Sequence, residues 1–173
     1  MIRSLYMNMK INSVKNKGIK AFRRTIIVGI AASFLATADE LIKRAVEKGK
    51  INNGVIKRTK GFAEIEKHHN HGFAMNRLDN REDIVTAVSV AACTGQTVMT
   101  YLTALTDEDI ITNAINVFLL AGALSNTYDR VRFGYVVDYL KVGKKKRAIY
   151  NISDFFIFFG AILAIIRAIC SKE

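Results

Sequence analysis

The 173-residue sequence contains no proline and no tryptophan, and its only cysteines are Cys93 and Cys170. Two cysteines are too few for a disulfide framework or for a four-cysteine zinc site. Without proline, no helix can be kinked by a pyrrolidine ring. Without tryptophan, aromatic anchoring at a membrane interface would fall to tyrosine. The composition therefore excludes the small disulfide-rich class of domain and domains built on a four-cysteine zinc site.

Charge is absent from two long stretches of the chain. Half of all residues are hydrophobic and 24% are charged, but residues 84–106 and residues 110–128 contain no charged side chain at all. A helix needs roughly 20 apolar residues to cross about 30 Å of hydrocarbon. These two stretches therefore predict transmembrane helices.

Two further apolar segments bring the predicted spans to four, at about 25–42, 84–106, 110–128 and 148–169. The 40–83 loop is too long for a simple connector, and it holds short β-prone pieces between glycine and asparagine turn signals. We predict an all-α integral membrane protein with four transmembrane helices. A small β-containing extramembrane subdomain is expected between the first two helices.

The net charge of +11 lies mainly outside the predicted spans. Residues 1–24 hold seven Lys or Arg side chains and no acid, and residues 144–147 form a second basic run. No aromatic interleaving or known module supports nucleic-acid binding, so we expect no nucleic-acid partner. Basic segments beside membrane spans are suited instead to anionic lipid headgroups.

The basic N-terminal region favours a cytoplasmic N-terminus, and four spans would return the C-terminus to the same side. The acidic turn at 107–109 stands against this trend, because it would also be cytoplasmic. Residues 36–38, Ala-Thr-Ala, offer the alternative of a cleaved signal peptide. Against cleavage, the preceding basic region is long, and the three later spans need a first helix to orient them.

The predicted topology brings four carboxylates to one membrane face: Asp39, Asp129, Asp138 and Asp154. Ionisable groups at membrane depth are costly and are usually kept for function. Two neighbouring carboxyls can share a proton, so that one acts as base towards a water while the other acts as acid. The structural alternative is an ion pair of Asp129 with Arg130 and a helix-start position for Asp154, where the helix dipole favours an acid.

Five segments resemble the motifs of signal peptidase II, the bacterial lipoprotein signal peptidase. Residues 122–130, 134–139 and 150–154 are similar to its C-terminal signature. Residues 39–43 resemble the motif that ends its first helix, and residues 69–74 its Asn-x-Gly motif in the following loop. The order and spacing fit from about residue 25 to the C-terminus.

The resemblance implies a four-helix membrane aspartyl endopeptidase, here residues 25–173 behind a basic cytoplasmic extension, residues 1–24. The family removes signal peptides from bacterial prolipoproteins, cutting before the cysteine that carries diacylglycerol. By motif match, Asp138 and Asp154 would be the catalytic pair. Residues that would bind substrate or order the site are Asn70, Asn126, Arg130, Asn151, Asp129, Asp39 and Lys43.

The same resemblance implies residence in the bacterial cytoplasmic membrane, with both termini cytoplasmic and the active site near the outer face. It implies no metal and no cofactor, and it leaves the oligomeric state open. His68, His69 and His71 are interpreted as part of a polar loop rather than as metal ligands.

This sequence departs from the common family pattern at Glu40, Ser125 and Ser153, where Gln, Gly and Ala are usual, and at Phe73 and Met75. None of these departures affects the predicted pair. Two alternatives stay open: a small ion or proton pathway that uses intramembrane carboxylates, and an inactive peptidase-like scaffold.

Overall fold

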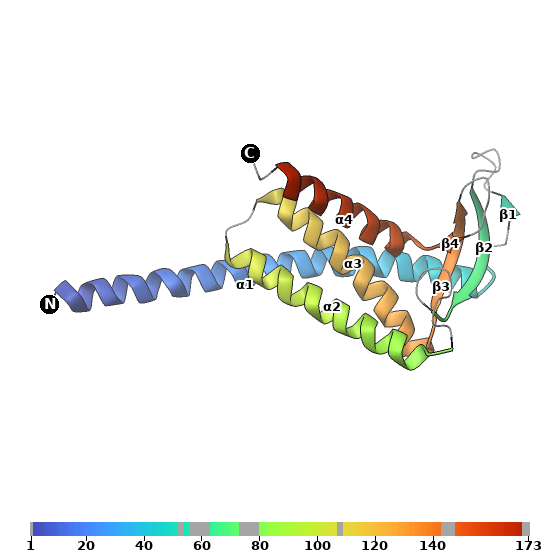
Figure 1. Cartoon of the computed structure of the whole chain (residues 1–173), viewed down its shortest axis with the longest axis horizontal. Helices are drawn as coiled ribbons and strands as arrows, with labels where there is room; N and C mark the ends of the chain where they lie inside the picture. Colours follow the sequence, from blue (N-terminus) through green and yellow to red (C-terminus); the bar gives the residue numbers. More distant parts are fainter. Residues whose placement is uncertain are drawn as a thin grey trace.

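The computed structural model describes residues 2–51, 54–55, 63–72, 80–106, 109–142 and 148–170. These residues form four long helices and one small sheet (Figure 1). In chain order the elements are α1 (Ile2–Glu47), β1 (Gly54–Val55), β2 (Ala63–Asn70), α2 (Glu82–Leu105), α3 (Ile110–Phe133), β3 (Val136–Val142), β4 (Ile149–Tyr150) and α4 (Ile152–Cys170).

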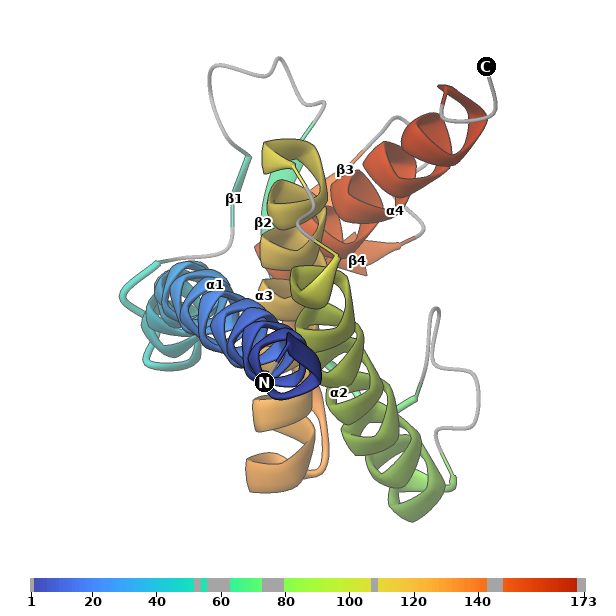
Figure 2. The same ribbon diagram turned by 90° about the vertical axis from the view of Figure 1, so that its left-hand side faces the viewer.

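All four helices are long and apolar enough to cross a membrane, which confirms the predicted fold class. Helix α3 lies in the middle of the bundle and packs against the other three. Viewed along the bundle, α4 and α2 diverge from each other towards the upper right and the lower right of α3 (Figure 2). The chain termini lie at one end of the bundle and the sheet lies at the other (Figure 1).

The sheet is antiparallel, with the strand order β1-β2-β3-β4. Strands β1 and β2 come from the connection between α1 and α2, as predicted. Strands β3 and β4 come from the connection between α3 and α4, which the predicted β-containing subdomain did not include. The pairing of β2 with β3 joins the two connections and brings Asn70 beside the strand that carries Asp138.

Three helix boundaries differ from the predicted spans. Helix α1 is continuous from Ile2, about 69 Å long at 1.5 Å per residue, and it extends well beyond the bundle (Figure 1). Helix α3 continues past residue 128 to Phe133, where Gly134 ends it with a positive φ of 82°. Helix α4 begins at Ile152 rather than at 148, because residues 149–150 pair with β3.

Glycines set the close approach of α3 to α4. A Cβ atom on Gly122 would lie 2.5 Å from the Ile157 side chain and 2.5 Å from the Ser153 carbonyl oxygen. A Cβ atom on Gly160 would lie 2.8 Å from Leu119 Cγ. Helices in a membrane associate mainly through such close packing, since lipid tails are as apolar as their side chains.

An ion pair links α4 to the turn between α2 and α3. Asp109 caps α3 by accepting the backbone N–H groups of Ile111 and Thr112, at 3.1 and 3.0 Å. Arg167 contacts the same carboxylate at 2.7 Å. The capping hydrogen bonds and this guanidinium lower the pKa of Asp109. Part of the acidic turn is thus balanced by a cation from α4, while residues 107–108 and the basic run at 144–147 lie outside the described residues.

Candidate active site

The carboxyl groups of Asp138 and Asp154 meet at a single residue, Asn151. The Asn151 side-chain amide donates to Asp138 Oδ1 at 2.8 Å, and its backbone N–H donates to Asp154 Oδ2 at 3.1 Å. Asp138 and Asn151 are both buried. The strand β3 and the first turn of α4, which carry the two acids, are therefore joined through one asparagine.

The start of α4 explains the position of Asp154. Asn151 Oδ1 accepts the backbone N–H of Asp154 at 2.9 Å, and the Asp154 carboxylate accepts the backbone N–H of Asn151 in return. This reciprocal arrangement is a capping box, which satisfies N–H groups that a helix start leaves unpaired. The capping box fixes the Asp154 carboxyl at the helix entrance.

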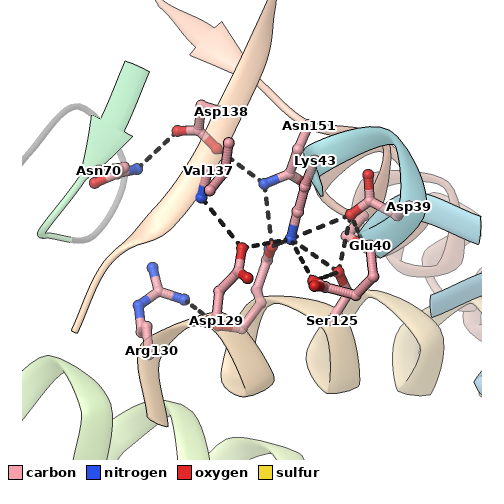
Figure 3. Close-up of polar contacts among 12 residues, drawn as sticks. Asp39, Glu40, Lys43, Asn70, Ser125, Asp129, Arg130, Val137, Asp138 and Asn151 are labelled. Atoms are coloured by element: carbon pink, nitrogen blue, oxygen red, sulfur yellow. Dashed lines mark hydrogen bonds and ion pairs between the residues drawn. The ribbon is translucent and has the colours of Figure 1, made fainter. Parts of the chain in front are cut away.

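Asp138 is held from the neighbouring strand as well. Asn70, at the end of β2, donates its amide to Asp138 Oδ2 at 3.1 Å. The register between β2 and β3 shifts between Ile65 and His68, which places His68 opposite Asp138. Figure 3 shows Asn70 and Asn151 approaching the Asp138 carboxyl from different elements.

Asn126 of α3 connects the pair to the helix bundle. Its amide nitrogen donates to Asp154 Oδ1 at 2.9 Å. Its oxygen accepts from the Asn151 amide at 3.0 Å and from Lys43 Nζ at 3.2 Å. Every amide group around the two carboxyls thus has a partner that fixes its orientation, which is the preorganisation that a catalytic site needs.

Arg130 lies one helical turn after Asn126, as the spacing predicts. Its guanidinium donates to the Gly72 carbonyl at 3.1 Å and to the Asn126 carbonyl at 3.4 Å. Its Nε is buried without a hydrogen-bond partner among the residues that the structure describes. A buried donor without a partner is costly, so this atom is a candidate to meet a substrate carbonyl.

Asp39 and Asp129 form a second cluster around Lys43. Lys43 Nζ lies 3.2 Å from Asp39 Oδ2 and 3.0 Å from Asp129 Oδ2, and all three side chains are buried. Asp129 also accepts the backbone N–H of Val137 at 3.1 Å, which ties α3 to β3 (Figure 3). The four carboxylates do gather as predicted, but only two of them are free of a direct cation contact within the described part of the chain.

The alternative of an Asp129–Arg130 ion pair is replaced by the contact of Asp129 with Lys43. Asp39 and Lys43 are both wholly buried.

Sequence reasoning missed three hydroxyl groups that meet at Asp39. Ser125 and Ser153 donate to Asp39 Oδ2 at 2.9 and 2.5 Å, and the Tyr139 hydroxyl donates to Asp39 Oδ1 at 2.8 Å. Burial and the Asp39 charge raise the pKa of Tyr139, so its hydroxyl keeps its proton. All three residues lie inside the segments that resemble the family motifs, but nothing in the sequence predicted that their hydroxyls would meet at Asp39.

Burial and, after it, the nearby charge of Asp154 together raise the pKa of Asp138 to about 7, although hydrogen bonds from Asn70 and Asn151 act in the opposite direction. Near neutral pH this carboxyl therefore exchanges a proton readily. A carboxyl that is protonated while its neighbour is ionised can serve as the acid of an acid–base pair.

Within the described ranges, no group of three or more His, Cys, Asp or Glu side chains is arranged to hold a metal ion. His69 and His71 instead contact the carboxylates of Glu47 and Glu82 and the ring of Tyr135. Phe73 and Met75 lie outside the described residues.

Residues 30–170 match the family model of signal peptidase (SPase) II. The lipoprotein signal peptidase of Caldanaerobacter subterraneus subsp. tengcongensis is 29% identical over 134 residues, covering 78% of this chain and 90% of that protein. The lipoprotein signal peptidase of Francisella tularensis subsp. novicida is 32% identical over 120 residues, covering 65% of this chain and 73% of that protein.

Two solved structures, both described as bacterial membrane enzymes, share the fold. One has a TM-score of 0.72 at 24% identity and covers 85% of this chain and 90% of its own. The other has a TM-score of 0.68 at 25% identity and covers 82% of this chain and 92% of its own. With a family model matched over most of its length, the chain belongs to the signal peptidase II family.

Proposed function

We propose that Asp138 and Asp154 are the catalytic pair with which this signal peptidase II removes signal peptides from prolipoproteins. The observation that carries the proposal is the bridge at Asn151, whose side chain holds one carboxyl while its backbone N–H holds the other. The bridge keeps two acids from separate elements close enough for the charge of Asp154 to raise the pKa of Asp138.

The pair would work with one shared proton. The ionised carboxylate takes a proton from a water whose oxygen attacks the scissile carbonyl carbon, and the protonated carboxyl donates to the carbonyl oxygen. When the carbon–nitrogen bond breaks, the carboxyl that took the water proton gives it to the departing amine. A hydroxyl of the intermediate returns a proton to the other carboxyl, so the pair again holds one proton.

The surrounding residues would orient this chemistry without exchanging protons. Asn70, Asn126 and Asn151 hold the carboxyls. Arg130 offers to the substrate backbone its Nε, which has no hydrogen-bond partner in the described part of the chain. The ordering residues Asp129, Asp39 and Lys43 lock α1, α3 and β3 together.

The site lies where the helices meet the sheet, at the end of the bundle away from both termini (Figure 1). At such an interface a cysteine carrying diacylglycerol keeps its acyl chains in the bilayer while the peptide bond before it reaches the carboxyls. This placement supports cleavage just before the lipid-modified cysteine.

We also infer that both termini are cytoplasmic and that the sheet and the site face outward. The N-terminal part of α1 carries six Lys or Arg side chains between residues 10 and 24 and no acid. Positive charge is retained on the cytoplasmic side of membrane proteins, where anionic lipid attracts it. Anionic headgroups are therefore the lipid partner that we expect for this segment.

The proposed pair is tested by cleavage of a diacylglyceryl-modified precursor in detergent. Asp138→Asn and Asp154→Asn are each expected to lower kcat by about a thousandfold or more, because each removes a proton carrier. Asp83→Asn, which alters an exposed carboxylate at the start of α2, is the matched control and should retain full activity. Full activity in either site variant would refute the proposed pair.

The distribution of charge favours hydrolysis over an ion pathway. A pathway needs ionisable groups through the depth of the membrane, but residues 84–106 and 110–128 have none. The charged side chains of α3 lie in its last two turns, beside the sheet. An inactive scaffold would have no need of the two amide-bridged carboxyls, and the family comparisons favour an active peptidase.

A further inference from the structure

Asn70, the residue that β2 contributes to the site, lies between two histidines that both contact carboxylates. His69 Nε2 lies 2.5 Å from Glu47 Oε1, at the last residue of α1. His71 Nδ1 lies 2.7 Å from Glu82 Oε1, at the first residue of α2. The end of β2 is thus attached to one helix on each side of Asn70.

Both histidine rings also rest against Tyr135, which immediately precedes β3. The His69 and Tyr135 rings are stacked, with centroids 4.2 Å apart and planes inclined by 25°. The His71 ring lies 5.3 Å from Tyr135. Tyr135 in turn contacts Phe133 at the end of α3, at 5.9 Å. The histidines are therefore held against the strand that carries Asp138.

The orientation of the Asn70 amide is set within the same segment. Its Oδ1 accepts the backbone N–H of Gly72 at 3.1 Å, which leaves Nδ2 to donate to Asp138 Oδ2. Gly72 is held in its turn by Arg130 through its carbonyl oxygen. A displacement of residues 69–72 would rotate or withdraw the amide that Asp138 accepts.

We propose that His69 and His71, together with Glu47 and Glu82, form a clasp that positions Asn70 against Asp138. The clasp acts through Asn70 and makes no contact with the reacting atoms, so its members are positioning residues. The inference rests on the proposed role of Asp138, and it adds the extramembrane ends of α1 and α2 to the machinery of the reaction.

The clasp is tested by measuring kcat and KM for cleavage of the diacylglyceryl-modified precursor, together with the Tm of each variant. His69→Phe and His71→Phe retain a ring for Tyr135 but cannot hydrogen-bond to glutamate. Each is expected to lower kcat about fivefold, the scale of one partly exposed hydrogen bond, with KM and Tm little changed. Glu47→Gln, which leaves the histidine in place, should lower kcat in the same direction.

A conservative variant and a matched control separate positioning from general packing. His69→Gln keeps an amide donor for Glu47 and should recover most of the activity that His69→Phe loses. Glu66→Gln alters another glutamate contact on the same strand, the 2.6 Å ion pair with Lys141, away from Asn70. Its kcat should equal that of the wild type, and an equal loss in Glu66→Gln would overturn the clasp.

A double mutant with Asn70 tests whether the clasp acts through that residue. If the clasp acts through Asn70, adding His69→Phe to Asn70→Ala should cause no further loss of kcat, because the group it positions is already absent. A full fivefold loss in that background would refute the proposal. Activity of Asp138→Asn is measured beside it, and full activity there would count against the catalytic pair whatever the coupling result.

Discussion

At the scale of single residues, three asparagines hold the two carboxyls of the proposed pair by hydrogen bonds. Asn70, Asn126 and Asn151 each donate an amide hydrogen to a carboxyl oxygen of Asp138 or Asp154. A neutral donor orients a carboxyl without fixing its charge as strongly as a cation would. Lys43, which also lies close by, is placed against Asp39 and Asp129 instead. The pair therefore stays free to exchange a proton.

The pKa of Asp138 predicts how activity depends on pH. The folded protein raises this pKa to about 7 from the ordinary value of 3.8 for an aspartate. The shared proton of the pair is then lost as the pH rises through about 7, so kcat/KM should fall roughly tenfold per pH unit above that point. A pH profile of precursor cleavage measures this limb, which should be unchanged in Asp83→Asn. A flat profile up to about pH 9 would contradict the assignment.

The same shift has a consequence for stability. Because the folded state binds the Asp138 proton more tightly than the unfolded state, this group stabilises the fold below about pH 4. That contribution is lost as the pH rises through about 7. At alkaline pH the buried Asp138 carboxyl is ionised, so it no longer contributes this stabilisation. The proton that it has lost is also the one that the proposed reaction needs.

At the scale of elements, the helices could be predicted and the sheet only in part. Uncharged runs located α2 and α3 because lipid imposes a length on apolar segments. The pairing of β2 with β3 is a tertiary contact between residues far apart in sequence, so no local pattern revealed that β3 and β4 complete the sheet. The start of α4 was misplaced because residues 149–150 are apolar, and only their pairing with β3 separates them from the helix.

The site contacts likewise divide into those that local sequence spacing predicts and those that depend on tertiary packing. Asn126 and Arg130 share a helix face by spacing alone, and Asn151 and Asp154 are close by their position at a helix start. The hydroxyls of Ser153 and Tyr139 reach Asp39 only because α1, β3 and α4 pack together, and the His69–Glu47 contact likewise depends on where α1 ends.

Helix packing gives a prediction with an internal control. Gly122→Ala should destabilise the protein by about 1–3 kcal/mol, because the added Cβ overlaps α4 and a well-packed core resists extra volume. Gly95→Ala in α2 meets no atom within 4 Å and should leave stability unchanged or slightly raise it, since alanine favours helix. Thermal unfolding in detergent compares the two. Equal Tm values would mean that α3 and α4 are not in close contact.

At the scale of the whole molecule, the long first helix and the distant sheet give the protein two unlike ends. One end is the basic stretch of α1, and the other carries the sheet with the amide-bridged carboxyls (Figure 1). Arg167 and Asp109 form an ion pair at the end that carries the basic stretch of α1, so an acidic side chain is present there as well. Positive charge is retained in the cytoplasm, so the basic stretch of α1 favours an orientation with this end inside the cell and the sheet outside.

The native cysteines allow that orientation to be measured. Cys170 is exposed at the end of α4 and Cys93 is buried, and both are free thiols. A membrane-impermeant maleimide should label Cys170 in inverted vesicles but not in intact spheroplasts. Cys170→Ser provides the blank. Labelling from outside would place the C-terminus, and with it the basic helix, on the external side.

The bridge at Asn151 ties the reaction to the lipid in which the protein lies. Asn151 caps a membrane helix and also links the two acids, so the same residue makes both sets of contacts. A membrane helix adjusts its tilt when the thickness of the hydrocarbon changes. Any tilt of α4 reaches Asp154 directly, whereas Asp138 stays with the sheet. The thickness of the bilayer therefore affects the distance between the two carboxyls.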